Sequence, residues 1–142
     1  MSSKQYAAGR QIQAPADAVW AFLTDAKALV AADTGITRIE GDIADGGSFK
    51  LWSEATGDRA FSIKVTAFDS PHRMVWSSGM PLGLFRGTRT FAIDPVDEGC
   101  SFDMDEVFTG LLVGPITKSM PDLTPLFERF VEAAKQAAEA SA

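Results

Sequence analysis

Two charged residues interrupt the apolar faces of two consecutive strands that the sequence predicts. Arg89 alternates with Phe91, and Glu106 alternates with Met104 and Phe108. Because successive side chains of a strand point to opposite faces, each charge is expected to share a face with large apolar groups. An arginine and a glutamate on an otherwise apolar face need an explanation in terms of chemistry or of pairing.

The segment between the two strands predicts how the charges are placed. Residues 94–99 combine Asp, Pro and Gly at the density typical of a turn, so the strands are expected to form a hairpin. The register that sets Phe91 opposite Met104 also sets Arg89 opposite Glu106. The sequence therefore predicts an ion pair on the face that carries the aromatic residues.

Such a pair has two interpretations. A buried charge without a partner is very costly, and a well-bonded pair only breaks even against an apolar replacement, so a buried pair points to function more than to stability. In that case Arg89 would anchor a carbonyl or carboxylate group of a ligand. Glu106 would orient the ligand or act as an acid or base, which makes it the best candidate for a catalytic residue. Alternatively, a bulge turns one of the two residues outward, and the pair is an exposed contact of little energetic weight.

Strand and helix signals alternate along the chain in a simple order. Residues 6–13 alternate as a short strand, a helix is expected to begin at Pro15, and a second short helix covers 26–32. Six antiparallel strands are expected to follow, separated by short turns, at 36–41, 48–53, 59–68, 73–78, 84–93 and 100–109. Regular hairpins would bring Val65 opposite Trp76 and Trp76 near Phe85.

The end of the chain supplies a cover for the apolar face of this sheet. After a short turn at 116–120, apolar residues recur at helical spacing from about Leu123 to Ala140, with Asp122 as the expected N-cap. A sheet with one apolar face requires a covering layer, and this amphipathic helix fits that need. The predicted fold class is therefore α+β: a curved antiparallel sheet of about seven strands, two short N-terminal helices, and a long C-terminal helix across the sheet.

The expected inner face between this sheet and the C-terminal helix is rich in aromatic residues. With two methionines near connecting segments, which could line an entrance, it gives these candidate ligand-binding residues: Phe49, Phe61, Trp76, Met80, Phe85, Arg89, Phe91, Met104, Glu106, Phe108, Met120, Phe127 and Phe130. Ordinary core packing would require many of the same aromatic side chains, and that interpretation stays open.

Composition excludes several classes of protein. The 142 residues suit one domain, 1–142, and the net charge of -6 without a basic stripe argues against nucleic-acid binding. No apolar run is long enough for a membrane span, and the polar start of the chain lacks the apolar core of a signal peptide. The single cysteine suits a reducing compartment. We therefore expect a cytoplasmic protein. One histidine and one cysteine cannot form the usual zinc site, and no glycine-rich phosphate loop occurs, so no metal or cofactor is expected. The oligomeric state stays open.

Several motifs together resemble those of a known superfamily. They are the runs Ile12–Asp25, Gly47-Ser48-Phe49, Trp76–Gly87 and Glu106–Gly110, placed in the order of elements given above. In these motifs the chain is similar to the START-like, birch-pollen-allergen-like superfamily (SRPBCC), and within it to the polyketide cyclase/dehydrase and lipid-transport group. The resemblance extends over nearly the whole chain and implies the helix-grip fold.

The same resemblance implies a cavity between the sheet and the C-terminal helix that accepts an apolar molecule. The first functional expectation is a protein that binds a small hydrophobic ligand, whether lipid-, polyketide- or aromatic-like. The second is an enzyme of the cyclase or dehydrase type that uses the same cavity, and the third is a co-chaperone-like interaction module. The fold alone does not decide between them, because its members perform all three roles.

Overall fold

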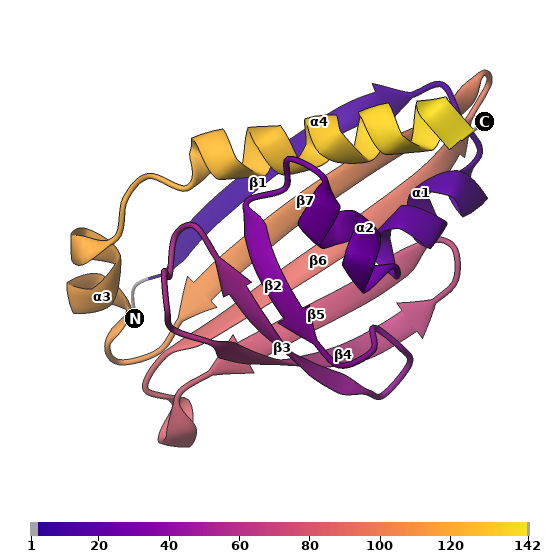
Figure 1. The fold of residues 1–142 in the computed structure, drawn as a ribbon. Coiled ribbons are helices and arrows are strands. Elements are labelled where there is room, and N and C mark those ends of the chain that lie inside the picture. Colours follow the sequence, from indigo (N-terminus) through magenta and orange to yellow (C-terminus); the bar gives the residue numbers. More distant parts are fainter. Residues whose placement is uncertain (1–2, 142) are drawn as a thin grey trace.

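The computed structural model describes residues 3–141 and has the α+β helix-grip architecture that the sequence predicts (Figure 1). Its elements, in chain order, are β1 (Lys4–Ile12), α1 (Ala16–Leu23), α2 (Ala26–Ala31), β2 (Ile36–Glu40), β3 (Ser48–Ser53), β4 (Phe61–Asp69), β5 (Arg73–Gly79), the 3-10 turn η1 (Pro81–Gly83), β6 (Arg86–Val96), β7 (Gly99–Thr109), α3 (Val113–Ser119) and α4 (Thr124–Ser141).

The strands form one antiparallel sheet in the order β1-β7-β6-β5-β4-β3-β2. Strands β2 to β7 follow one another as a meander, and β1, from the start of the chain, pairs with β7 at one edge of the sheet. Helix α4 crosses one face of the curved sheet, and α1 and α2 cover the rest of that face (Figure 1). The apolar side of the sheet therefore faces helices.

The hairpin of β6 and β7 has the predicted register, with Phe91 opposite Met104 and Arg89 opposite Glu106. Its strands are longer than the sequence predicts, because pairing continues to Val96 opposite Gly99. The predicted turn at residues 94–99 therefore shortens to Asp97 and Glu98. Turn-forming residues mark the tip of a hairpin but do not stop the strands from pairing close to it.

The register of the central strands confirms one prediction and corrects another. Val65 lies opposite Trp76, as expected. Trp76 does not pair near Phe85, however, because β5 pairs with β6 so that Trp76 lies opposite Arg89, and Phe85 precedes the paired part of β6. This register places the Trp76 indole next to the Arg89–Glu106 pair.

The two helices at the end of the chain begin close to prolines. Asp122 Oδ1 accepts a hydrogen bond from the backbone N–H of Thr124 at 2.9 Å, at the start of α4. The predicted turn at 116–120 is instead the helix α3, which contains Pro115 in its first turn. A proline is tolerated there because the first amides of a helix have no partner within it.

No helix among residues 3–141 is both long and apolar enough to cross a membrane.

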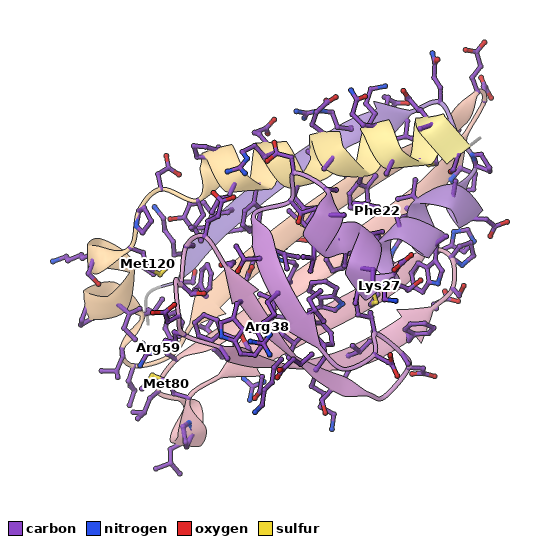
Figure 2. All side chains as sticks on the ribbon, in the orientation of Figure 1. Phe22, Lys27, Arg38, Arg59, Met80 and Met120 are labelled. Carbon is purple, nitrogen blue, oxygen red and sulfur yellow. The ribbon has the colours of Figure 1, made fainter. Side chains whose placement is uncertain are left out.

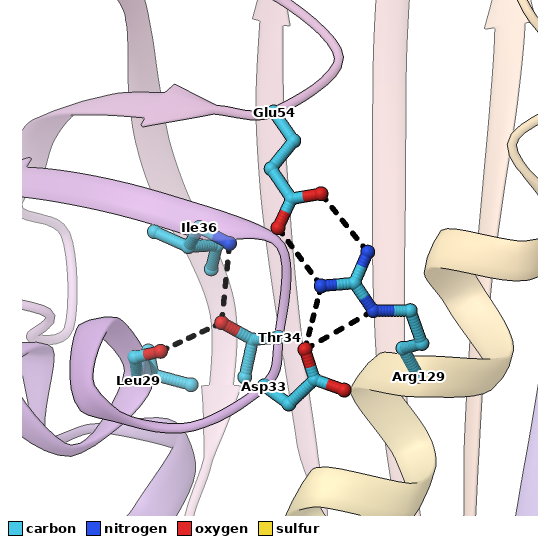
Figure 3. A network of polar contacts seen from close by, with 6 residues as sticks. All are labelled: Leu29, Asp33, Thr34, Ile36, Glu54 and Arg129. Carbon is cyan, nitrogen blue, oxygen red and sulfur yellow. Dashed lines mark hydrogen bonds and ion pairs between the residues drawn. The ribbon is translucent and has the colours of Figure 1, made fainter.

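A network of hydrogen bonds and ion pairs links α4 to the edge of the sheet formed by β2 and β3 (Figure 3). The Arg129 guanidinium donates to Asp33 Oδ1 at 2.6 and 3.1 Å and to the two Glu54 oxygens at 2.9 and 2.8 Å. These hydrogen bonds lower the pKa of both carboxyl groups from its usual value. Beside them, Thr34 donates to the carbonyl oxygen of Leu29 at 2.6 Å. The network joins the helix to the α2–β2 connection and to the end of β3.

Candidate functional site: an ion pair on an aromatic face

Arg89 and Glu106 form an ion pair on neighbouring strands. The Arg89 Nη2 lies 2.8 Å from Glu106 Oε1, and Nε donates to the same oxygen at 2.9 Å. The side chains are 20% and 13% exposed, respectively. They are therefore largely shielded from water, although a small part of each remains accessible. An exposed cross-strand contact does not describe this geometry.

The Arg89 guanidinium also contacts the helix that covers the sheet. Its central carbon lies 4.9 Å from the ring centroid of Phe127 and 5.8 Å from that of Phe130, both on α4. A cation over aromatic faces gains electrostatic stabilisation where water is partly excluded. The ion pair, whose residues come from β6 and β7, thus lies between the sheet and α4.

The second oxygen of Glu106 has room because residue 87 is a glycine. A Cβ atom at Gly87 would lie 2.8 Å from Glu106 Oε2 and 3.0 Å from the Phe108 ring, so a larger residue would displace both. Among residues 3–141, Oε2 accepts no hydrogen bond, because Arg89 uses only Oε1. This oxygen is available to accept a hydrogen bond or a proton. No group of three or more His, Cys, Asp or Glu side chains within 3–141 is placed to hold a metal ion.

Trp76 places a polar group without a partner beside this pair. It lies opposite Arg89, is 3% exposed, and packs edge-on against Phe49 at 5.1 Å and Phe91 at 4.8 Å between ring centroids. Its indole Nε1 is buried, and no acceptor for it exists among residues 3–141. Buried donors are nearly always bonded, so this N–H is an unusual feature of the interior. The Phe130 ring lies 5.8 Å beyond Phe91 and completes the aromatic layer.

A second aromatic group lies on the other side of Arg89. Phe85 stacks on Phe108 at 5.5 Å, and Tyr6 contacts Phe108 at 6.2 Å and Phe127 at 5.8 Å. Tyr6 is 8% exposed and was not among the candidate site residues. Its alternation with Ile12 on the first strand was the available signal, but a strand at the edge of a sheet gives no indication of which face is covered.

The thirteen candidate residues differ in how deeply they are placed. Seven are buried: Phe49, Trp76, Phe91, Met104, Phe108, Phe127 and Phe130. Five are half-buried: Phe61, Phe85, Arg89, Glu106 and Met120. Met80 is exposed at 43%, at the start of the η1 turn. The structure therefore brings most of the predicted set to one layer, and it leaves Met80 outside that layer.

Two hollows on the surface of the described residues do not include Trp76 in their linings. One, of about 470 Å³, lies between the start of β1 and the α3–α4 connection and includes Tyr6 and Met120. The other, of about 410 Å³, includes Ile12 and Val96 near the β6–β7 turn. Figure 2 shows Met120 between α3 and α4, at the same end of the molecule as Met80. The first hollow therefore adjoins the aromatic group around Tyr6.

Comparisons with known proteins agree with this architecture. The structure of protein jhp0584 from Helicobacter pylori matches with a TM-score of 0.78 at 12% identity, covering 95% of this chain and 88% of that one. A norcoclaurine synthase variant from Thalictrum flavum, in complex with a transition-state analogue, matches with a TM-score of 0.71 at 16% identity, covering 99% and 96%. The di-domain aromatase/cyclase StfQ from the steffimycin pathway matches at 0.75 and 13%, covering 98% of this chain and 52% of that one.

These likenesses show the class of the fold, a helix-grip architecture. A model of the family described as polyketide cyclase / dehydrase and lipid transport matches residues 5–139, so the chain belongs to that family. None of the curated proteins compared with the chain matches it.

Proposed function

We propose that this protein binds a small hydrophobic molecule, lipid-, polyketide- or aromatic-like, between the sheet and α4. The observation that carries the proposal is a set of three polar groups within an aromatic layer: the paired side chains of Arg89 and Glu106, and the Nε1–H of Trp76, which has no hydrogen-bond partner among residues 3–141. In a core that served only stability, a pair of apolar residues in place of Arg89 and Glu106 together would cost little, and a donor without a partner would be absent. A ligand oxygen that accepts from Trp76 supplies the missing partner.

The charges of the site favour an uncharged ligand. Arg89 is already neutralised by Glu106, so a ligand carboxylate would leave one negative charge in excess in a poorly hydrated layer. A carbonyl, ether or hydroxyl oxygen on an apolar skeleton satisfies the Trp76 N–H without that cost. The hollow beside Tyr6 and Met120 is the proposed entrance, because it opens to solvent and adjoins the aromatic group formed by Tyr6 and Phe127.

Fluorescence titration with the neutral apolar dye N-phenyl-1-naphthylamine tests this proposal. We expect saturable binding with about one dye per chain, and displacement of the dye by uncharged apolar compounds that carry a carbonyl group. Native mass spectrometry of the purified protein would show directly whether such a compound is retained, and would give its mass. A dye signal that rises linearly without saturation, together with a ligand-free mass spectrum, would contradict the proposal.

A second function, an enzyme of the cyclase or dehydrase type, is favoured by one observation. Glu106 Oε2 is free of hydrogen bonds while Oε1 is held by Arg89, so the carboxylate is fixed in position with one oxygen available for proton transfer. In this case Glu106→Gln would abolish turnover of a true substrate and leave dye binding unchanged. Equal turnover by the wild type and the variant would remove the enzymatic role of Glu106 and leave the binding function standing.

A further inference from the structure

The end of the molecule that carries η1 and α3 exposes large apolar side chains. Leu82 is 94% exposed, Leu111 is 71% exposed and Met80 is 43% exposed, the three highest values for large hydrophobic residues among 3–141. Leu82 is also in the left-handed backbone region, at φ 62°, which a leucine rarely adopts. Neither feature helps the chain to fold, because exposure and backbone strain both cost free energy.

The loops that carry these residues are bound to each other. The N–H of Leu112 donates to the carbonyl oxygen of Leu84 at 2.8 Å. Gly110 makes the approach possible, because a Cβ atom there would lie 2.5 Å from that oxygen and 2.7 Å from the carbonyl oxygen of Gly83. We call residues 79–88 and 108–121 together the apolar tip. Both segments lie at the end of the sheet where β1 begins (Figure 1).

The charge of the apolar tip is opposite to that of the whole chain. Neither of its segments contains Asp or Glu, although the chain has 19 of these residues and a net charge of -6. The tip contains two basic residues, Arg86 and Lys118, and Lys4 on β1 lies opposite Phe108 at its margin. The carboxylates nearest in sequence to the second segment already have partners: Glu106, before it, pairs with Arg89, and Asp122, after it, caps α4.

We infer that the apolar tip docks onto an anionic lipid bilayer, with Leu82 and Leu111 inserted into the interface and Arg86, Lys118 and Lys4 facing the headgroups. Exposed leucines in segments that contain basic residues and no carboxylates match such a surface, which combines apolar depth with negative charge. The acidic remainder of the chain would be repelled, so docking is confined to this end. The inference concerns the outer surface and does not depend on a ligand between the sheet and α4.

A second copy of this chain fits the apolar tip less well. If two tips packed face to face, Arg86 and Lys118 of each copy would meet cations of the other, with no carboxylate in either segment to pair them. A bilayer supplies the missing negative charge without any requirement for shape. Charge complementarity therefore favours lipid over self-association.

Flotation with vesicles of phosphatidylcholine containing about 30% phosphatidylserine tests the inference. The variant pair Leu82→Asn with Leu111→Ser is compared with the control pair Val30→Ser with Val96→Asn, which alters exposed valines elsewhere on the surface. We expect the partition coefficient to fall about tenfold for each leucine replaced, and to stay at the wild-type value in the control. Salt at about 0.5 M should weaken binding of the wild type, because it screens the basic residues.

Thermal unfolding and far-UV circular dichroism should be unchanged in the leucine variants, because these side chains are exposed and Asn tolerates the left-handed region. The inference is overturned if the wild type stays in the bottom fraction of the gradient and does not float with the vesicles. It is also overturned if both variant pairs float equally well, or if the wild type self-associates through the apolar tip and ignores lipid.

Discussion

Removal of one partner of the Arg89–Glu106 pair should destabilise the fold, whereas removal of both should not. Breaking a fully buried pair typically costs about 3–5 kcal/mol, because the remaining charge is left without compensation. The two side chains here are 20% and 13% exposed, so water reaches part of each, and the lower end of that range applies. We expect Arg89→Met and Glu106→Leu each to lower the free energy of unfolding by about 3 kcal/mol.

The double variant Arg89→Met with Glu106→Leu should unfold within about 1 kcal/mol of the wild type, since apolar side chains of similar size replace the pair. Urea unfolding at neutral pH measures all four proteins, and the coupling energy of this cycle should be about 6 kcal/mol, because both single losses disappear in the double variant. For a chain of this length, each single variant should melt about 10 °C lower. If the single variants cost less than about 1 kcal/mol and show no coupling, the pair behaves as a surface contact, and the placement of charge in the interior is wrong.

Three further predictions concern the surroundings of the site. Trp76→Phe removes the N–H that has no partner among residues 3–141, so it should weaken binding of an oxygen-bearing ligand about fivefold in the dye-displacement titration. The smaller side chain should lower the free energy of unfolding by only about 1 kcal/mol, as measured in urea. Trp52→Phe is the control in both experiments. Arg129→Met should have a lower free energy of unfolding than the wild type at neutral pH. This difference should shrink as the pH falls through the lowered pKa values of Asp33 and Glu54, because the protonated carboxyl groups no longer attract Arg129. Urea unfolding from pH 7 down to about pH 3 measures it. Gly110→Ala should lower the free energy of unfolding by about 2 kcal/mol or more, because its Cβ would meet carbonyl oxygens at 2.5 Å, whereas Gly46→Ala, also at positive φ but in open space, should cost only the backbone strain.

The register of the sheet could be predicted because side chains alternate and the turns are short. Phe91 opposite Met104 follows from those two facts alone, and the placement of Arg89 opposite Glu106 follows with it. The helix α3 was missed because Pro115 reads as a break, and only its position in the first turn makes it compatible with a helix. Local signals therefore give the elements and their pairing, but they do not settle the ends of each element.

Contacts between distant parts of the chain could not be predicted from local sequence patterns. Arg129 binds Glu54 and Asp33, which lie 75 and 96 positions away, and no local pattern links them. The position of Trp76 in the aromatic layer could be predicted, but the missing partner of its N–H depends on every neighbouring atom. That donor, which distinguishes the site from an ordinary core, became visible only once the layers were packed.

Nuclear magnetic resonance of the indole N–H groups tests the central claim most directly. The chain has three tryptophans, so a ¹⁵N-labelled sample should give three indole signals, of which Trp76→Phe identifies one. On titration with an uncharged apolar carbonyl compound that displaces the naphthylamine dye, we predict a saturable shift of the Trp76 signal at about one ligand per chain, larger than the shifts of Trp20 and Trp52. An unchanged Trp76 signal while the ligand binds would contradict the proposed site between the sheet and α4.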